Sequence, residues 1–590
     1  MIEPRIYRAA LLPALLAVLV AMFSVESRPA PLPRGLPADG LFDPSRVLEE
    51  AEKMTAARGE EGGDSAGTAS PRRVAESLAT SGFESSIDNF EVGDRKLANV
   101  SGRRAGTVAS ESQIVVVANR SGAGPGGAAA GAADTAALLE LGRALEGRAS
   151  RRTVTLVSLD GARLDEAGAR RLAEMLDPRR VEAVLAISGL GARGDLEAPI
   201  VPWSNGPTRA SPRLARTAGD AVRQELGTLP GQETLPGQLL RLAFPLGIGA
   251  QGVFLDHRIQ AIRFSGSGEL PDAEDSVPEL DRRRLGALGS AVLRTVSALD
   301  GRGLASDESP GAYLIGARQL VPGWSLALVA IALLVPAVVT VADGFARVGR
   351  RRRGVGAWIL WVFAGALPFA AVYGLLRLHD LVGLVPGFGV AGPPSAEPPT
   401  GWSLVLLAAI VLALTLTWLF GRRKLVRRLH GLSRASDPGA GAAVALVVCV
   451  CVLALWSVNP LAALFLVPAV HLWSGAAVAA GSRPGLVLAM AGLVLPLAAG
   501  VFWLHRLSLG PLEGLWYAAL LVAGGQVEPL GALLGCLLLG AFLSLLAVLS
   551  ARAEEAASAP PPPSAPPPTR GPLSYAGPGS LGGTRSALRR

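Results

Sequence analysis

The sequence has little cysteine: it contains three in 590 residues, Cys449, Cys451 and Cys536, and all three lie inside long apolar runs. The first 300 residues contain none, which excludes a disulfide framework, a cysteine nucleophile and a thiolate metal site from that part of the chain. Histidine is also scarce. Of the five histidines, only His257 precedes residue 300, so a site there that needs two imidazoles cannot be built.

Acidic residues are outnumbered by basic ones, which gives a formal net charge of +8. Much of the excess lies in two short clusters, 347–353 and 422–428, and each cluster separates apolar runs. Lys and Arg beside membrane spans mark the cytoplasmic side, and the same side chains bind anionic lipids. We therefore interpret the charge as a topology signal and expect membrane lipids, and no nucleic acid, as partners.

Long apolar runs dominate the second half of the chain. Runs of about 18 apolar residues cross a hydrocarbon core of about 30 Å, which predicts an integral membrane protein. Leu515–Gly524 is too short for a firm span and suits an interfacial or re-entrant segment, so we expect about eight or nine spans including an N-terminal anchor. The predicted spans after the anchor are Trp324–Val341, Ala357–Leu376, Trp402–Phe420, Ala442–Val458, Leu461–Trp473, Leu486–Leu504 and Leu530–Leu549.

The chain divides by composition. Arg5 and Arg8 precede an apolar segment, as in a signal peptide or a signal anchor, and we prefer the uncleaved anchor because no sharp cleavage site follows. The basic clusters place the N-terminus inside and the polar domain outside the membrane, the cytoplasmic membrane if the protein is bacterial. We expect an anchor (1–26), a Pro- and Gly-rich tether (27–71), a folded extracytoplasmic domain (72–303), a multi-span domain (324–550) and a disordered Pro-rich tail (551–590).

The polar domain alternates short apolar runs with amphipathic stretches. This alternation predicts an α/β domain with a mostly parallel sheet and helices on both faces, joined to an all-α membrane domain. The expected strands are Ile114–Ala118, Val154–Leu159, Ala183–Ile187 and Ala261–Phe264, and the expected helices are Thr135–Leu145, Asp165–Leu176, Pro212–Leu226 and Arg282–Leu299.

The polar domain resembles the co-catalytic di-zinc aminopeptidases, a family that includes secreted bacterial aminopeptidases and glutamate carboxypeptidase. An ordered series of segments carries the resemblance rather than a single motif. It implies an aminopeptidase-like fold over most of residues 72–303. The segments are Asn99–Gly102, Ile114–Gly122, Gly127–Leu141, Leu159–Ala169, Val184–Gly189 and Phe264–Asp272.

The residues at the family's metal positions depart from the pattern. A co-catalytic zinc pair needs neutral imidazoles and carboxylates, one of which bridges both ions. The resemblance places the five ligand positions at Asn119, Ala129, Arg163, Ser188 and Ser265, and the general base at Ala162. The fixed positive charge of an arginine repels zinc. We therefore expect no catalytic residue, metal or cofactor, and an aminopeptidase-like domain that does not hydrolyse peptides.

Four acidic residues nevertheless lie near these positions in sequence: Asp134, Asp160, Asp165 and Glu166. Asp134 and Asp160 are candidates for a shared crevice at the carboxyl ends of parallel strands, where such folds bind ligands. The plainer interpretation is a helix-terminal acid and a turn residue.

Two further patterns are weak. The Gly-rich segment 122–127 follows a strand but lacks the spacing of a phosphate-binding motif. Asp256 and His257, with Ser265 or Ser267, resemble part of a catalytic triad, yet no nucleophile elbow occurs.

The order of anchor, inactive peptidase-like domain and membrane spans is similar to that of the glycosylphosphatidylinositol transamidase attachment subunit. This resemblance implies a binding or scaffold protein for a peptide or a lipid-linked group, working with other membrane subunits. Two alternatives remain open: a membrane-bound zinc aminopeptidase with misaligned ligands, and a transporter or lipid-handling protein that acts through its spans.

Overall fold

The computed structural model describes residues 4–558 apart from short gaps. The Gly-rich segment 122–127 and the Pro-rich tail beyond Ser558 lie outside the described residues. The gaps are 34–40, 62–69, 109–111, 121–127, 195, 197, 230, 232, 272–276, 305–307, 351–354, 384–391, 429–434 and 480.

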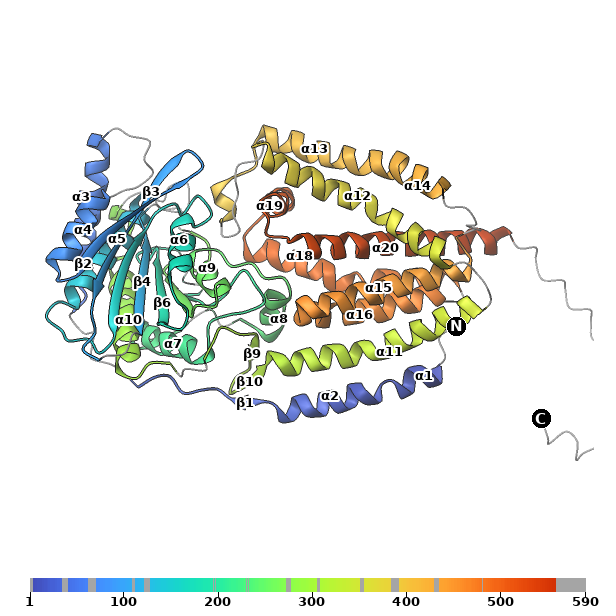
Figure 1. Ribbon diagram of the computed structural model, residues 1–590, viewed down its shortest axis with the longest axis horizontal. Helices are drawn as coiled ribbons and strands as arrows, with labels where there is room; N and C mark the ends of the chain where they lie inside the picture. The colour runs from blue at the N-terminus through green and yellow to red at the C-terminus, as the bar shows by residue number, and fades with distance from the viewer. Residues whose placement is uncertain are drawn as a thin grey trace, which may run out of the picture.

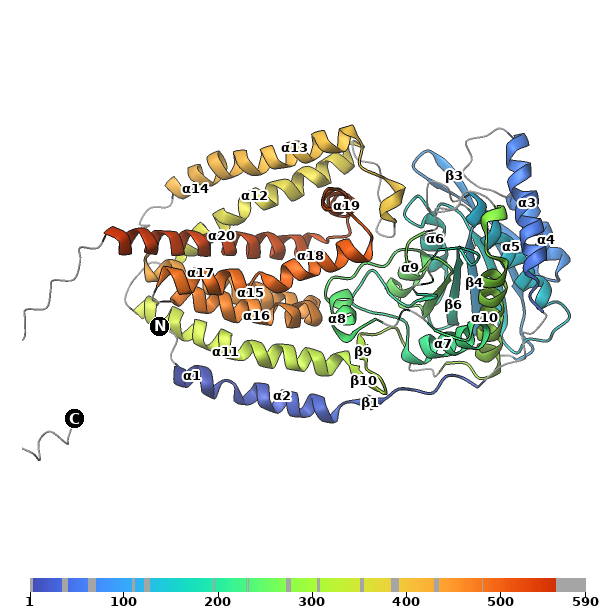
Figure 2. The same ribbon diagram turned by 180° about the vertical axis from the view of Figure 1, so that it is seen from behind.

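An α/β domain forms one end of the molecule and a bundle of long helices the other (Figures 1 and 2). The domain is built on a seven-stranded sheet with the order β2-β3-β5-β4-β6-β8-β7. The strands are β2 (Glu84–Val92), β3 (Arg95–Arg104), β4 (Gln113–Asn119), β5 (Thr153–Leu159), β6 (Val181–Ser188), β7 (Ile200–Val201) and β8 (Ala261–Ser265).

The four central strands, β5, β4, β6 and β8, are parallel to one another. Their continuous apolar runs are typical of strands buried on both faces, and Val115, Val116 and Leu185 are fully buried. At the edges, β2, β3 and β7 run antiparallel to their neighbours, so the sheet is mixed, with a parallel centre. The expected strands and helices of this core are all present.

Helices cover both faces of the sheet. Helix α7 illustrates their local signals: Ser211 accepts a hydrogen bond from the Leu214 N–H at the N-cap, Pro212 takes the first turn, and Gly227 ends the helix in the left-handed region. The helices are α4 (Pro71–Thr80), α5 (Ala128–Ala144), α6 (Ala167–Met175), α7 (Pro212–Leu226), α8 (Leu235–Ala243), α9 (Ala250–Asp256) and α10 (Arg282–Gly301).

The segment expected to be a tether contains a helix of the domain core. Helix α3 (Pro44–Glu61) packs on α5 and α10. Val47, Ala51 and Met54 are buried in the same hydrophobic cluster as the central strands. Only a narrow apolar stripe of this helix is buried, and the rest of the segment is charged. The segment is therefore not hydrophobic overall, and its composition predicted a linker.

Within the described residues, eight helices are long and apolar enough to cross a membrane. All of the spans expected after the anchor coincide with one of them. The helices are α1–α2 (Pro4–Ala9 and Leu12–Phe23), α11 (Gly323–Arg350), α12 (Val355–Leu381), α13 (Gly401–Leu416, continued to Arg428 by a π-helical turn and α14, Arg423–Arg428), α15 (Pro438–Val458), α16 (Pro460–Val478), α17–α18 (Ser482–Ala491 and Val494–Arg506) and α20 (Pro529–Ser558).

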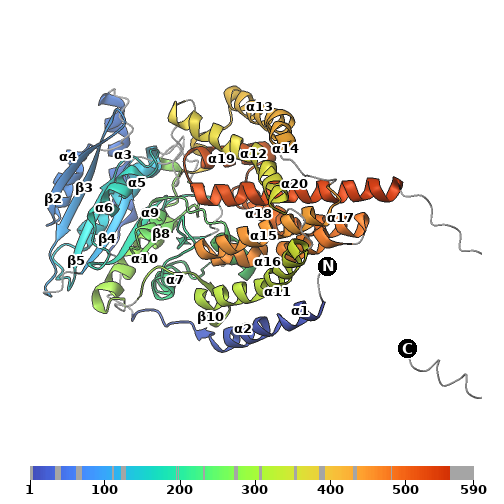
Figure 3. The same ribbon diagram turned by 45° about the vertical axis from the view of Figure 1, so that its right-hand side comes forward.

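The weak apolar segment forms a separate short helix, α19 (Pro511–Ala523). It is viewed end-on in Figure 1, whereas the spans are viewed lengthwise, so it lies across the bundle close to the α/β domain. The described residues of both basic clusters lie at the far end of the bundle, where α11 and α14 end. The N-terminal helix α2 runs beside α11 (Figure 3).

The two domains meet in a packed junction. Helix α8 lies against α16, and Trp203, Leu242 and Leu461 share one hydrophobic cluster. The side chain of Asn459, between α15 and α16, donates hydrogen bonds to the Leu242 and Ala243 carbonyls at 3.0 and 3.2 Å. A small sheet of β1 (Glu26–Ser27), β10 (Gln319–Pro322) and β9 (Tyr313–Ile315) joins the ends of α2 and α11.

Candidate functional site

Three of the positions singled out in the sequence stand at the carboxyl ends of parallel strands. Asn119 ends β4, Ser188 ends β6 and Ser265 ends β8, and Ser188 and Ser265 are register partners. In open parallel sheets this edge is where ligands bind. These three residues and the loops that follow them form the candidate site, which we call the crevice edge.

Glu166 occupies the centre of the crevice edge. Its carboxylate accepts hydrogen bonds from Asn119 Nδ2 at 3.1 and 3.3 Å, and its side chain is buried. Burial raises the pKa of Glu166 to about 7, although the hydrogen bond from Asn119 and the charge of Arg263 act in the opposite direction. Asp165 and Glu166 both have left-handed backbones, with φ of 57° and 51°. Such strain in non-glycine residues persists where the surrounding structure holds it, often at functional sites.

A buried arginine lies behind this carboxylate. Arg263, on β8, is 5% exposed and donates hydrogen bonds to the Gly268 and Glu269 carbonyls at 3.2 and 3.0 Å. Burial lowers the pKa of Arg263, and the charges of Glu269, Glu166 and Asp134 oppose this effect. The crevice edge thus contains a built-in cation surrounded by carboxylates.

Asp134 fastens helix α5 to the loop after β6. Its carboxylate accepts backbone N–H groups from Gly189 at 2.9 Å and from Leu190 at 3.5 Å. Gly189 has a φ of +56°, a conformation that suits glycine in the tight turn leaving the strand. Asp134 therefore positions the loop that borders the crevice edge.

Asp160 fastens the opposite side of the site. It accepts hydrogen bonds from Arg120 at 2.7 Å, from the Ala98 N–H at 3.2 Å and from the Gly161 N–H at 2.8 Å. Arg120 is 1% exposed and also donates to the Ala98 carbonyl at 2.6 Å. This buried pair ties β3 to the ends of β4 and β5, so Asp160 and Asp134 serve different loops.

The remaining positions of the resemblance, the ligand positions Ala129 and Arg163 and the general-base position Ala162, have no side chain that is an ordinary zinc ligand. Ala129 and Ala162 are buried, with 1% and 2% exposure, and Arg163 is exposed. The acidic residue that the fold places beside Asn119 is Glu166, a few positions farther along the same loop. The family resemblance did not assign Glu166 to a site position. Its closeness in sequence to a strand end was the signal that could have identified it.

The donor chemistry of the crevice edge does not fit a zinc pair. Zinc sites in proteins use imidazole, thiolate and carboxylate ligands. Asp160 is paired with Arg120, Asp134 receives amide N–H groups, and Glu166 is bonded to Asn119 beside a buried guanidinium. In the part of the chain that the structure describes, no group of three His, Cys, Asp or Glu side chains is arranged to hold a metal ion.

The triad-like residues serve ordinary structural contacts. His257 Nδ1 contacts the Val253 carbonyl of its own helix at 2.9 Å. Asp256 accepts the Gly206 N–H at 3.1 Å. Ser265 Oγ lies 3.4 Å from Ser267 Oγ, and Ser267 donates to the Leu270 carbonyl at 2.7 Å. These bonds stabilise a helix end and two loops.

A buried charge network joins the crevice edge to the membrane domain. Glu269, in the loop after β8, accepts a hydrogen bond from Arg241 of α8 at 2.8 Å and lies 3.5 Å from Arg506 at the end of α18. Arg241 also pairs with Glu233. The pKa of Glu269 is lowered: burial raises it, but Arg241 and Arg506 more than offset this effect.

Comparison with known structures finds zinc-dependent exopeptidases and glutaminyl cyclases that are similar to part of this chain. The zinc aminopeptidase from Bacillus subtilis is 11% identical and has a TM-score of 0.35, covering 45% of this chain and 98% of its own. The glutaminyl cyclase from Porphyromonas gingivalis is 17% identical and has a TM-score of 0.33, covering 44% of this chain and 98% of its own. The zinc-dependent exopeptidase from Parabacteroides distasonis is 14% identical and has a TM-score of 0.33, covering 43% and 98%.

At these identities and TM-scores the likeness concerns the fold and does not bear on chemistry. No protein-family model matches the chain, and no curated protein matches it either. The chain is an α/β domain joined to a helical domain with candidate membrane spans.

Proposed function

We propose that the protein is an integral membrane binding subunit whose α/β domain does not hydrolyse peptides. The observation that carries the proposal is the chemistry of the crevice edge, where Arg263 supplies a fixed positive charge next to Glu166. A cation that cannot be deprotonated opposes the binding of a second cation beside it. Loss of a metal removes the reaction but leaves the crevice available for binding.

The ligand that we propose is an extended polypeptide or a lipid-linked group presented at the membrane. Asn119 Oδ1 is buried and has no hydrogen-bond partner among the described residues, so it is an acceptor suited to a peptide N–H. Glu166 and Arg263 add one acidic and one basic group within the same edge. A site with both signs of charge suits the polar backbone of a peptide better than a purely anionic or cationic ligand.

The helical domain anchors this site, and we place the α/β domain on the extracytoplasmic side. The proposal rests on the basic clusters 347–353 and 422–428, which lie at the end of the bundle remote from the α/β domain. The packed junction, with Asn459 bonded to α8, suits a subunit that holds its ligand in a fixed orientation for a partner. A scaffold role like that of a transamidase attachment subunit would use this arrangement.

The first test measures metal and activity together on the full chain in a mild detergent. After zinc loading and desalting, zinc content is determined by mass spectrometry and hydrolysis of aminoacyl-nitroanilides is followed. Glu166→Gln is the matched variant, because it removes the carboxylate best placed to contact a metal while keeping the size of the side chain.

We expect sub-stoichiometric zinc, no turnover, and no difference between the wild type and E166Q. One or two zinc ions per chain, with turnover that both a chelator and E166Q abolish, would overturn the proposal in favour of an active aminopeptidase. A folded chain that gives the expected result is then tested for binding of labelled peptides, with E166Q and Arg263→Gln as the variants that weaken it.

A further inference from the structure

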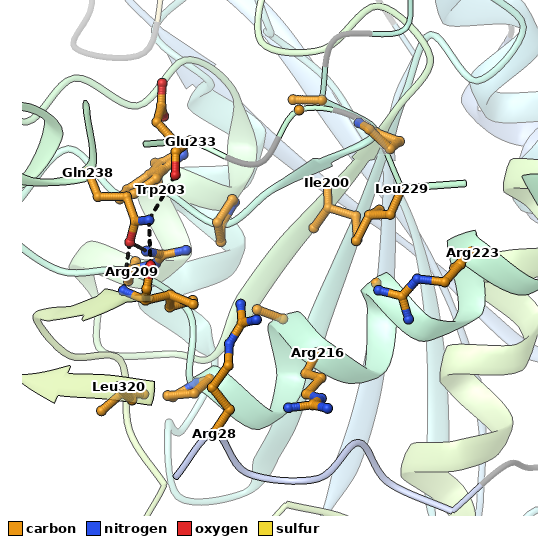
Figure 4. Close-up of a pocket in the computed structure, with 18 of the residues that line it drawn as sticks. Arg28, Ile200, Trp203, Arg209, Arg216, Arg223, Leu229, Glu233, Gln238 and Leu320 are labelled. Carbon is orange, nitrogen blue, oxygen red and sulfur yellow. Dashed lines mark hydrogen bonds between the residues drawn. The ribbon is translucent and has the colours of Figure 1, made fainter. Parts of the chain in front are cut away.

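A separate cavity of about 210 Å³ lies beside the edge strand β7, between α7, α8 and the sheet that contains β10. It is lined by Trp203 of the packed junction between the two domains and by Arg506 at the end of α18, and Figure 4 shows it in close-up. Its walls include the apolar side chains of Ile200, Leu229 and Leu320. We call it the arginine pocket, because Arg28, Arg209, Arg216, Arg223 and Arg506 line it.

The lining of the arginine pocket is positive, although Arg223 is paired with Asp220 and Arg506 with Glu269. Among the described residues that line it, the acidic one is Glu233, which is already paired with Arg241 of α8. Burial lowers the pKa of Arg28, and repulsion from Arg216 and Arg209 lowers it further. Like charges held this close raise the energy of the empty pocket, and an anion between them relieves the repulsion.

The fold builds this pocket in two ways. Arg216 and Arg223 are two helical turns apart, so they project from the same face of α7 (Figure 4). Ala215 and Gly219 of the same helix also line the pocket, and such small residues leave room for a ligand to reach both guanidinium groups.

Arg209 forms the fixed end of the pocket. It is 5% exposed, its guanidinium lies over the rings of Trp203 at 4.2 Å and Tyr313 at 4.7 Å, and it donates to Gln238 at 3.1 Å. Its Nε is buried without a hydrogen-bond partner among the described residues. Stacking on two rings holds the group rigid, so little entropy is lost when it binds an anion.

The pocket lies at the level where membrane helices end. Arg28 closely follows α2, which ends at Phe23, and Leu320 immediately precedes α11, which begins at Gly323. Arg506 is the last residue of α18. The helix ends of a membrane domain lie near the headgroup region of the bilayer, and the pocket is therefore within reach of a lipid headgroup.

A topology signal does not account for these arginines. Excess Lys and Arg mark the cytoplasmic side, and the clusters that do so lie at the opposite end of the bundle. Guanidinium groups bind phosphate oxygens in a bidentate manner, with charge-assisted hydrogen bonds. We propose that the arginine pocket binds the phosphate of an anionic lipid headgroup, with the apolar walls contacting the adjoining glycerol.

The experiment uses the full chain in a neutral detergent and measures lipid binding by native mass spectrometry. Short-chain phosphatidylglycerol is the probe, phosphatidylcholine is the lipid control, and glycerol phosphate is the soluble control. The test variant is Arg216→Gln with Arg223→Gln. Arg282→Gln with Arg283→Gln, two exposed arginines at the start of α10, is the matched variant of equal charge change.

We expect preference for phosphatidylglycerol over phosphatidylcholine, and roughly tenfold weaker binding in R216Q/R223Q, because two partly exposed charge contacts are lost. The Arg282 and Arg283 variant should bind as the wild type does. The two test positions are exposed on α7, so the variant is expected to fold, and its melting temperature checks this.

Equal binding of both lipids, or unchanged binding in R216Q/R223Q, overturns the proposal. Glycerol phosphate that binds as tightly as the lipid overturns the lipid assignment in favour of a soluble phosphate ester. If R216Q/R223Q does not fold, Arg28→Gln provides the same comparison from outside α7. None of these outcomes depends on the zinc and peptidase measurements, so the two proposals fail separately.

Discussion

Replacing Arg241 with methionine tests the idea that the two domains are held together by a buried charge network. Arg241 is 2% exposed. It pairs with Glu233 and with Glu269, the latter at 2.8 Å, and its guanidinium lies 5.1 Å from the ring of Trp203 and 5.4 Å from that of Trp503. Methionine keeps most of the apolar contact but leaves two carboxylates without their main partner.

The expected cost follows from the burial of Glu269, which is 8% exposed. Removing one member of a buried ion pair typically costs about 3–5 kcal/mol, because the other charge remains desolvated. Arg506, 3.5 Å from Glu269, still compensates in part, so we expect about 3 kcal/mol.

The effect depends on pH in a defined direction. The pKa of Glu269 is lowered in the folded protein because Arg241 and Arg506 outweigh burial. Its stabilisation is therefore present above the ordinary carboxyl pKa and is lost as pH falls through the lowered folded value. In R241M the pKa of Glu269 rises, so the loss begins at higher pH.

The assay is thermal unfolding of the full chain in detergent, followed by tryptophan fluorescence, for R241M, Glu269→Gln and the double variant. Interacting groups of this kind show coupling energies of roughly 0.5–3 kcal/mol, and we expect a value in the upper half of that range. Arg283→Met, at an exposed position, is the control and should change little. A cost below about 1 kcal/mol for R241M, or additive single changes, would refute the role of the network.

Three further predictions concern the site and the junction. In the folded protein the pKa of the Glu166 carboxyl is about 7, against 4.5 ordinarily. The stability of the wild type therefore falls as pH rises from 4.5 to about 7, and E166Q should not show this fall. Melting curves at pH 8 should find E166Q about 3 kcal/mol more stable than the wild type. Asp134→Ala leaves the Gly189 N–H without its acceptor and should cost about 1–3 kcal/mol in denaturant titrations. Asn459→Ala removes the bonds to the Leu242 and Ala243 carbonyls and should increase hydrogen exchange in α8, while unchanged exchange there would argue against a fixed junction.

The parts of the fold that could be predicted are those in which one physical requirement dominates. Strands β4, β5, β6 and β8 are buried on both faces, and such strands need unbroken apolar runs that are visible in sequence. The membrane spans are visible for the same reason. Strand β2 has one exposed face and a polar composition, so it did not stand out from a loop. A charged helical patch around residues 46–58 is visible in the sequence, but α3 buries only a narrow stripe, so its place in the domain core was not predicted.

The site was less predictable because its residues come together through contacts that have no sequence spacing. Asn119 was identified through the family resemblance, as one of the ligand positions. Its partner Glu166 was known only as one of several nearby acids, and the left-handed turn that brings it to Asn119 has no glycine to signal it. Arg263 lay inside an expected strand, where an arginine gives no sign that it points into a charged cluster.

Buried charges link the crevice edge to the membrane domain. Glu166, Arg263, Glu269 and Arg506 alternate in sign along a path from the crevice edge to the end of α18. Each charge is desolvated and is stabilised chiefly by its neighbours, so a change at one end alters the partner of the next. A ligand that contacts Glu166 or Arg263 therefore changes the electrostatic environment of Glu269, and with it the contact to Arg506. Glu166 and Arg506 are far in sequence from Arg263 and Glu269, and only the folded chain turns the four residues into a connection between the two domains.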